Sequence, residues 1–322
     1  MNWVITGGCG FIGISLIRQL LKEDGHNIRI LDNLTTGTRD DLSEACVFLE
    51  TSKNNISDFN DLELIVGDVL DEDLAVKVTK GADIIVHLAA NTGVGPSVEN
   101  PRLDCMANVI GTFNYLEAAR INTVIRFIFA SSGAPVGEVE PPIHEELPPH
   151  PVSPYGASKL AGEGYCSAYY KTFNIQTVAL RFGNVYGPGS GHKSSIVAKF
   201  IRQAINKETL EIYGDGTQTR DFIYIDDLTN ALRLAVTAQN IGGEVFQIAS
   251  NQETTIGEIT EKLVGILNLS GINDIDIINR ETRLGDVKRN YSDTSKAKSR
   301  LDWQPIMNQE EGLKKTVEYF LK

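Results

Sequence analysis

The sequence carries a tyrosine and a lysine at a spacing that suits proton transfer. Tyr155 and Lys159 stand four residues apart in a segment that is predicted to be helical after Ser153 and Pro154, so both side chains share one helix face. An ammonium beside a phenol stabilises the phenolate and would lower the tyrosine pKa from its usual value of ~10. Tyr155 is therefore a candidate general base, although the spacing alone is also common among surface contacts.

A serine pair supports this interpretation. Ser131 ends an apolar segment, Ile125–Ser131, that has the length and composition of a buried strand, and Ser132 follows it directly. Ligands of open α/β sheets bind at the carboxyl ends of parallel strands. A hydroxyl at such an end indicates that Tyr155 and Lys159 face a ligand site.

A glycine-rich loop follows the first strand-like run, Asn2–Thr6. Gly7, Gly10 and Gly13 have the spacing GxxGxxG, and a helix is expected to begin within the loop. Such glycines allow a tight turn, close approach of the backbone to a pyrophosphate, and close packing of helix on sheet, while the helix N-terminus supplies N–H donors. The loop predicts a dinucleotide-binding site.

A carboxylate at the end of the second strand-like run selects the cofactor. Asp32 ends the run that begins at Ile28 and lies 19 residues beyond Gly13. A carboxylate there accepts hydrogen bonds from a ribose diol and repels a 2′-phosphate. Because no basic residue follows until Arg39, NAD is predicted rather than NADP.

The elements that position these residues alternate in type. Apolar, turn-bounded runs are separated by helix-length segments, which predicts an α/β fold with a doubly wound parallel (Rossmann) sheet and right-handed crossovers. The expected strands are Asn2–Thr6, Ile28–Asp32, Leu62–Val66, Asp83–Ala89, Ile125–Ser131 and Gln176–Phe182. The expected helices are Phe11–Lys22, Leu74–Lys80, Arg102–Arg120 and Pro154–Thr172.

The alternation ends after about Phe182, at the glycine-rich stretch Gly187–Gly191. A helix over Ser195–Asn206, a strand over Phe222–Ile225, a helix over Gly257–Leu267 and a strand over Asp274–Ile278 are expected beyond it. This change predicts a smaller, interleaved C-terminal α/β domain. The expected division is an NAD-binding domain over 1–181, to which 222–250 returns, and a substrate domain over 182–221 and 251–322.

Composition excludes several classes of partner. Acidic residues outnumber basic ones by 42 to 30, and the net charge of -12 opposes binding to nucleic acid or to an anionic membrane. No signal peptide and no apolar run of ~18 residues is present. Four scattered cysteines and five scattered histidines lack metal-ligand spacing. A cytoplasmic protein without a metal site is expected.

Taken together, the motifs resemble the extended short-chain dehydrogenase/reductase superfamily, and within it the nucleotide-sugar epimerases of the UDP-glucose 4-epimerase type. They occur in the family order and cover nearly the whole chain. Besides the glycine loop, the serine pair and Tyr155 with Lys159, the matching stretches are His87–Ala90, Arg181–Asn184 and Thr219–Phe222.

The resemblance implies a mechanism. Tyr155 would remove the proton of the sugar 4-hydroxyl, Lys159 would tune Tyr155 and hold the nicotinamide ribose, and Ser132 would hydrogen-bond O4. Hydride would pass to NAD and return to the other face of a 4-keto sugar, so NAD would stay bound. The resemblance also implies a homodimer in which the helices expected over Arg102–Arg120 and Pro154–Thr172 form a four-helix interface.

The family pattern also assigns binding residues. Those implied for the cofactor are Gly7, Gly10, Phe11, Ile12, Gly13, Asp32, Asn33, Asp68, Val69, Leu88, Ala89, Ala90, Asn108, Tyr155, Lys159 and Phe182. Those implied for a nucleotide-sugar substrate, most simply a UDP-hexose, are Thr92, Ser132, Asn184, Ser195, Ile196, Tyr213, Arg220, Arg283, Asp286 and Asn290.

Departures from the pattern narrow the reaction. Gly133 and Ala134 occupy the positions of an Asp-Glu pair in sugar 4,6-dehydratases, and the second is typically Glu in nucleotide-uronate decarboxylases. Neither residue can exchange a proton, so C4 epimerisation is favoured over both reactions. Pro135 and Val136 replace the more usual Val-Tyr and reshape the expected wall of the site.

The sugar stays open at this level. Thr92 replaces a lysine of some hexose epimerases, Gly95–Pro96 replaces an arginine and an aromatic residue of uronate epimerases, and Asn290 has an intermediate size where bulk governs N-acetyl groups. UDP-N-acetylhexosamine and UDP-uronate 4-epimerases are therefore alternatives, followed by a 4,6-dehydratase and a non-catalytic NAD-binding regulator.

Overall fold

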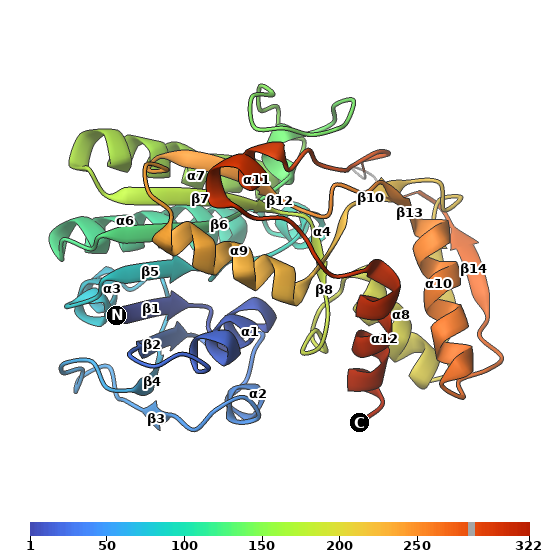
Figure 1. The fold of residues 1–322 in the computed structure, drawn as a ribbon, viewed down its shortest axis with the longest axis horizontal. Helices are drawn as coiled ribbons and strands as arrows, with labels where there is room; N and C mark the ends of the chain where they lie inside the picture. The colour runs from blue at the N-terminus through green and yellow to red at the C-terminus, as the bar shows by residue number, and fades with distance from the viewer. Residues whose placement is uncertain (283–286) are drawn as a thin grey trace.

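An eight-stranded sheet forms the centre of the larger half of the molecule (Figure 1). The computed structural model describes residues 1–282 and 287–322. The strands lie in the order β12-β7-β6-β5-β1-β2-β4-β3, and every neighbouring pair is parallel. The strands are β1 (Asn2–Thr6), β2 (Asn27–Asp32), β3 (Leu49–Glu50), β4 (Leu62–Val66), β5 (Ile84–His87), β6 (Arg126–Ser132), β7 (Gln176–Phe182) and β12 (Glu244–Ile248).

Helices cover both faces of this sheet because its strands are apolar on both faces. Along β1, Trp3 and Ile5 enter the core beneath one helical layer and Val4 enters the core beneath the other. The first layer contains α1 (Phe11–Leu20), α9 (Ile225–Thr237) and α11 (Ser295–Leu301), and the second contains α3 (Glu72–Thr79), α6 (Gly111–Ile121) and α7 (Pro154–Phe173). The predicted doubly wound parallel sheet is confirmed.

One long helix of the sequence analysis is interrupted. The segment expected as a single helix over Arg102–Arg120 consists of α5 (Pro101–Cys105), a π-helical turn (Met106–Ile110) and α6. A π-turn inserts an extra residue into the helical repeat, and periodicity over a short window does not reveal it. Two short helices, α2 (Arg39–Ser43) and α4 (Val94–Glu99), follow β2 and β5.

The smaller half is built on a separate core. Buried side chains of α8 (Ile196–Ile205), α10 (Ile256–Leu269) and α12 (Gln309–Phe320) pack together with those of short strands. The strand pairs are β8 (Asn184–Tyr186) with β11 (Phe222–Tyr224), β9 (Leu210–Tyr213) with β14 (Ile277–Arg280), and β10 (Thr219–Arg220) with β13 (Thr254–Thr255). The last strand was expected over Asp274–Ile278, whereas β14 begins three residues later, at Ile277.

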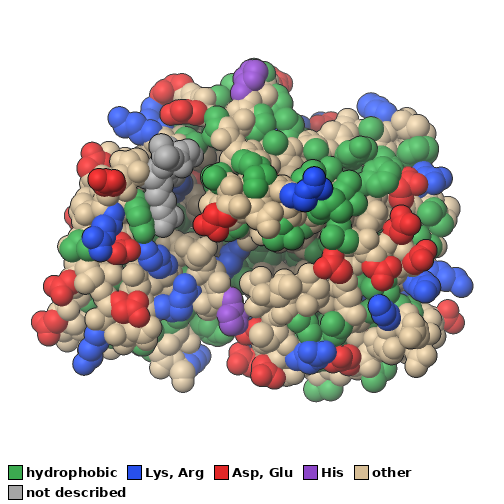
Figure 2. Space-filling view, turned by 180° about the vertical axis from the view of Figure 1, so that it is seen from behind, with side chains coloured by type: hydrophobic (Ala, Val, Ile, Leu, Met, Phe, Trp, Pro, Cys, Tyr) green, Lys and Arg blue, Asp and Glu red, His purple; other side chains and the backbone are tan. Residues whose placement is uncertain are grey.

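The chain passes between the halves more than once. It leaves the large sheet after β7, returns through α9 and β12, and ends on the smaller half at α12 (Figure 1). Within residues 1–282 and 287–322, no helix combines the length and hydropathy needed to cross a lipid bilayer. The space-filling view shows a hollow where the two halves meet (Figure 2).

Candidate active site

The carboxyl edge of the large sheet collects most of the residues expected to bind a cofactor. The glycine loop follows β1, Asp32 ends β2, Ser132 ends β6 and Phe182 ends β7. The segments after β4 and β5 supply Asp68, Val69, Leu88, Ala89 and Ala90. Because parallel strands place their carboxyl ends along one edge, residues from six separate strands line one rim.

The glycine loop has no room for side chains at two of its glycines. Gly7 has φ +68°, and a Cβ there would lie 2.8 Å from the backbone nitrogen of Ala89. A Cβ on Gly13 would lie 2.5 Å from the Cα of Gly8. Gly10 begins α1 without a side-chain cap, and the first turn of α1 has no acidic residue. The first-turn N–H groups are therefore free of a capping side chain, which suits an anionic pyrophosphate.

Asp32 lies beside this loop and is held by backbone donors. Its Oδ2 accepts a hydrogen bond from the N–H of Cys9 at 2.9 Å, and its Oδ1 accepts one from the N–H of Leu34 at 2.8 Å. Burial raises the pKa of this carboxyl, and the two backbone hydrogen bonds oppose that shift. Each oxygen keeps a lone pair, so the group suits a ribose diol. The glycine cradle and Asp32 together fit NAD.

Further residues expected along the cofactor are joined to one another. The Nδ2 of Asn33 donates to Asp68 at 3.0 Å, and the Nδ2 of Asn114 donates to the carbonyl of Val69 at 3.0 Å. The N–H of Ala89 donates to the Thr6 hydroxyl at 3.2 Å. These bonds tie the loop after β2 to the loop after β4, the loop after β4 to α6, and the segment after β5 to the end of β1.

The structure brings Ser132, Tyr155 and Lys159 together at this rim. Tyr155 lies in the first turn of α7, which Ser153 caps by accepting from the N–H of Gly156 at 3.1 Å. Tyr155 is hydrogen-bonded to the Ser132 side chain. The Lys159 ammonium donates to the carbonyl of Ala130 at 2.9 Å and lies 5.9 Å from the centre of the Tyr155 ring.

The pKa values differ from the sequence expectation. Burial raises the pKa of Tyr155 to about 12, and the hydrogen bond with Ser132 only partly offsets this effect. Burial also lowers the pKa of Lys159 to about 8, although the carboxylates of Asp104 and Glu163 favour its charged form. The expected lowering of the Tyr155 pKa by Lys159 is thus not seen in this structure. A phenolate at Tyr155 needs further positive charge beside it.

A buried amide network supports the helix that carries this pair. The Nδ2 of Asn108 has three acceptors within hydrogen-bond distance, which are Asp104 at 2.8 Å, the carbonyl of Asn91 at 2.9 Å and the Ser158 hydroxyl at 3.1 Å. Ser158 in turn donates to the backbone carbonyl of Tyr155 at 3.0 Å. Sequence reasoning missed Asp104, which stands four residues before Asn108 and is 1% exposed.

A second hollow collects residues expected to bind the substrate. It encloses about 810 Å³, counting space open to solvent, beside the smaller half of the molecule. Its lining includes five of the expected residues, Asn184, Ser195, Ile196, Tyr213 and Arg220. We call it the substrate cleft. The guanidinium of Arg220 donates to the carbonyls of Thr219 and Val287.

Sequence reasoning missed other residues of the substrate cleft. The Lys199 ammonium lies 5.3 Å from the centre of the Tyr213 ring and 3.7 Å from Glu211. Gln218 donates to the carbonyl of Tyr213 at 2.5 Å. Lys199 stands three residues after Ile196 on α8, so helical periodicity could have placed both on one face.

The remaining expected substrate residues lie apart from this set. Asn290 borders the other end of the site, with its Nδ2 3.9 Å from the position of a Cβ on Gly133. Thr92 is exposed and does not line the cleft. Arg283 and Asp286 lie outside the described residues. Within residues 1–282 and 287–322, no group of His, Cys, Asp and Glu is placed to hold a metal ion.

Fold and site together define a dinucleotide-binding α/β protein with a tyrosine and a lysine at the cofactor rim. Residues 3–249 match the model of the NAD dependent epimerase/dehydratase family. The chain belongs to this family, and its cofactor is NAD. Both the predicted family and the predicted cofactor are confirmed.

Similar proteins act on related sugars. The chain is 36% identical to a putative UDP-glucose 4-epimerase of Methanocaldococcus jannaschii, over 98% of this chain and 97% of the relative. The solved UDP-glucose 4-epimerase of Thermotoga maritima with UDP-glucose superposes with a TM-score of 0.89 at 32% identity, over 100% of this chain and 99% of that one. UDP-glucuronic acid 4-epimerase of Bacillus cereus, solved with UDP-glucuronic acid and NAD, has a TM-score of 0.88 at 30% identity, over 100% and 99% of the chains. The family and its members thus support a nucleotide-sugar epimerase that uses NAD, while the sugar differs among relatives.

Proposed function

We propose that this protein interconverts the C4 epimers of a nucleotide-diphosphate sugar of the UDP-glucose/UDP-galactose type through a transient 4-keto sugar. The observation that carries the proposal is the convergence of Ser132, Tyr155 and Lys159 at the rim where the glycine loop and Asp32 fit NAD. The likeness to UDP-glucose 4-epimerases along the whole chain supports the choice of sugar.

The proposed proton path uses Tyr155. Its phenolic oxygen takes the proton of the sugar 4-hydroxyl and gives it back at the end of the cycle. Ser132, which is hydrogen-bonded to Tyr155, orients the same sugar oxygen. Lys159, fixed by the carbonyl of Ala130, contributes positive charge behind the phenol. When bound, NAD supplies a positively charged nicotinamide ring that accepts hydride from C4 and returns it.

The cofactor would be held by the rim already described. Backbone N–H groups at the start of α1, through Phe11 and Ile12, would face the pyrophosphate, and Asp32 would bind the adenosine ribose. Asn33, Asp68 and Val69 would border the adenine, and Leu88–Ala90, Asn108 and Phe182 would line the remainder. Because the reaction has no net redox change, NAD would remain bound between turnovers.

The substrate would occupy the substrate cleft with its sugar toward Ser132. Arg220 would bind the diphosphate, since a guanidinium matches phosphate oxygens. Asn184, Ser195, Ile196 and Tyr213 would complete the cleft. Arg283 and Asp286 are proposed partners for the diphosphate and a ribose. We assign the cleft to a domain over 182–221 and 251–322, and the cofactor to 1–181 with 222–250. Two elements depart from this division, since β11 packs in the core of the smaller half and α11 packs in the core of the large sheet.

Two alternatives to epimerisation at C4 lack a catalyst. The site offers Gly133 and Ala134 where dehydratases and decarboxylases need groups that exchange protons. UDP-uronate and UDP-N-acetylhexosamine remain second candidates as sugars, because similar solved structures include a UDP-glucuronic acid 4-epimerase at a TM-score of 0.88 and a UDP-N-acetylglucosamine 4-epimerase at 0.87. Asn290, close to Gly133, is the residue whose size, by the family pattern, would admit or reject an N-acetyl group.

Proton NMR of the purified protein with UDP-, dTDP-, CDP- and GDP-sugars tests the proposal. A UDP-hexose should convert to its 4-epimer with no lasting rise in reduced-nicotinamide absorbance. Tyr155→Phe should lower the rate at least about 100-fold with NAD binding kept, and Ser132→Ala about 30- to 1000-fold, or roughly 2 to 4 kcal/mol. A 4-keto-6-deoxy product, or full activity of Tyr155→Phe, would refute it.

A further inference from the structure

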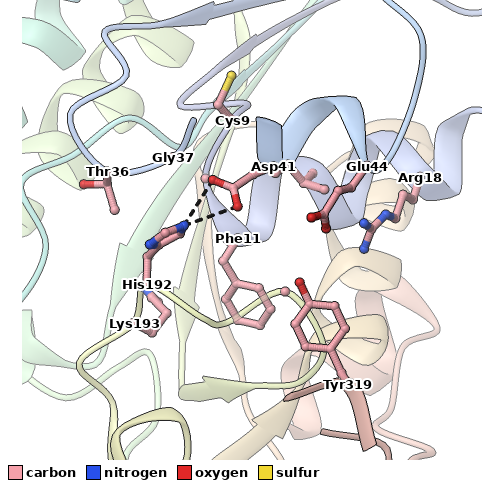
Figure 3. Close-up of a pocket in the computed structure, with 13 residues that line it drawn as sticks. Cys9, Phe11, Arg18, Thr36, Gly37, Asp41, Glu44, His192, Lys193 and Tyr319 are labelled. Atoms are coloured by element: carbon pink, nitrogen blue, oxygen red, sulfur yellow. Dashed lines mark hydrogen bonds and ion pairs between the residues drawn. The ribbon is translucent and has the colours of Figure 1, made fainter. Parts of the chain in front are cut away.

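The loop between β8 and α8 reaches from the smaller half across to the glycine loop. We call residues 187–194 the bridging loop. A Cβ on Gly189 would lie 3.6 Å from the Phe11 ring, so the bridging loop covers the start of α1. His192 Nε2 lies 3.1 Å from Asp41 Oδ2, and Figure 3 shows this link between the two halves of the molecule. The loop therefore contacts the cofactor half at two points.

Hydrogen bonds fix the backbone of the bridging loop. The N–H of Lys193 donates to the carbonyl of Ser190 at 2.9 Å, and the Ser190 hydroxyl donates to the carbonyl of Gly187 at 2.7 Å. The Arg202 guanidinium of α8 donates to the carbonyls of Gly191 and Lys193. Because its backbone is fixed by these hydrogen bonds, the bridging loop holds its side chains in defined positions.

Lys193 lies at the boundary between the two halves. It lines a cavity together with Gly10 and Phe11, the residues at which α1 begins (Figure 3). Its charge is also close enough to Lys159 to lower the pKa of that ammonium. Lys193 therefore lies between the N-terminus of α1 and the Tyr155–Lys159 pair, along the edge where the cofactor binds.

Among the described residues, no carboxylate or carbonyl oxygen pairs with the Lys193 ammonium. Two cations on neighbouring elements have partners, since Arg39 is paired with Glu50 and Lys199 with Glu211, while Arg18 of α1 lines the same cavity as Lys193. Burial lowers the pKa of Lys193, which means that the charged ammonium is less stable at this position than in water. A bound anion would offset this loss by stabilising the charged form.

The anion could be the diphosphate of the nucleotide sugar or the pyrophosphate of NAD. The position of Lys193 favours the pyrophosphate of NAD. The substrate cleft is lined by Ser194 and Ser195 but not by Lys193. Lys193 instead shares its cavity with the uncapped start of α1, where first-turn N–H groups attract a pyrophosphate. The acidic residues Asp41 and Glu44 line the same cavity, and Asp41 is already hydrogen-bonded to Thr38 and His192.

We propose that Lys193 binds the pyrophosphate of NAD from the side opposite α1, and that the bridging loop, held by His192 and Asp41, closes over the cofactor and slows its release. The bound dinucleotide would then be gripped between backbone donors of the cofactor half and one side chain of the smaller half. This inference rests on the family's cofactor and not on the identity of the sugar.

The test measures NAD binding without turnover. Wild type, Lys193→Met and Lys193→Arg are stripped of cofactor, their folding is checked by thermal melting, and NAD affinity is measured by calorimetry. Lys193→Met should bind NAD about 10- to 100-fold more weakly, as expected for the loss of a charge-assisted phosphate contact, and Lys193→Arg should recover most of the affinity. Lys77→Met, an exposed lysine on α3, is the charge-matched control and should bind as wild type.

Release kinetics test the closure. The NAD dissociation rate, followed with a competing trap, should rise about 1.5- to 5-fold in His192→Ala, because an exposed pair of this kind contributes little beyond holding the loop. Wild-type NAD affinity in Lys193→Met would overturn the assignment of Lys193. An unchanged release rate in His192→Ala would overturn the closure. Neither readout depends on which sugar, if any, is converted.

Discussion

At the residue scale, the proposed catalytic pair, Tyr155 and Lys159, lies in surroundings that disfavour the charged form of each side chain. Burial raises the pKa of Tyr155 to about 12 and lowers that of Lys159 to about 8. Both shifts disfavour the phenolate-ammonium pair that proton transfer requires. The carboxylate of Asp104 acts on both residues, because it favours a protonated Lys159 and also favours a protonated Tyr155. Asp104 is therefore expected to set the pH range of the reaction.

Asp104→Asn tests this role. The amide keeps an acceptor for Asn108 but removes a negative charge, so the pKa values of Tyr155 and Lys159 should both fall. The phenolate then forms at lower pH and the ammonium is lost at lower pH, so both limbs of the kcat/KM profile should move to lower pH. A merely structural role would reduce the rate and leave the limbs in place. An unmoved profile would show that Asp104 is uncharged at working pH.

At the scale of elements, the glycine loop depends on the absence of one methyl group. Gly13 lies inside α1, and a Cβ there would meet the Gly8 Cα at 2.5 Å and the Gly7 carbonyl oxygen at 2.7 Å. Gly13→Ala should cost roughly 1–3 kcal/mol of unfolding free energy and weaken NAD binding. Gly265→Ala, in the middle of α10 with open space around it, should instead stabilise by about 0.5–1 kcal/mol. Urea unfolding and NAD calorimetry of both variants check this contrast.

Comparison of the expected and observed elements shows which of them the sequence predicts. Six of the eight strands of the large sheet were predicted because they are apolar and bounded by turns, and β1, β4 and β7 match the expected bounds. The edge strands β3, whose two residues are exposed, and β12 were not predicted. Nor were the π-turn over Met106–Ile110 and the position of β14. The register of β14 depends on its partner β9, which lies far away in sequence. Tertiary contacts of this kind leave no local pattern.

The residues of the candidate site also fall into those that local sequence patterns predict and those that depend on tertiary packing. The glycine loop, Asp32, Ser132, Tyr155 and Lys159 follow from residue type and spacing, since each stands at a strand end or on one helix face. Asp104, Lys193 and Lys199 carry no motif, and their places depend on how α5, the bridging loop and α8 pack. The pKa of Tyr155 was also beyond reach, because it depends on burial rather than on its neighbour in sequence.

At the scale of the whole molecule, exposed apolar side chains gather on one face. Figure 2 shows hydrophobic side chains gathered on the side of the large sheet that carries α5, α6 and α7. Exposed apolar side chains on α5, the π-turn and α7 are Leu103, Met106, Ile110, Tyr165 and Phe173. A patch of this kind on adjacent helices marks an association surface, which supports the proposed homodimer through a four-helix interface.

Light scattering at micromolar concentration should therefore give twice the chain mass of 35.3 kDa. Leu103→Glu should shift the protein toward the monomer, because a dimer would bury the new carboxylate in apolar surroundings. Leu269→Glu is the matched control, since Leu269 ends α10 on the smaller half and is 87% exposed. A wild-type monomer, or equal dissociation by both variants, would contradict the interface. Since α7 also carries Tyr155 and Lys159, loss of the dimer should loosen the helix that presents them, and epimerase activity of Leu103→Glu should fall with the dimer fraction when the protein is diluted.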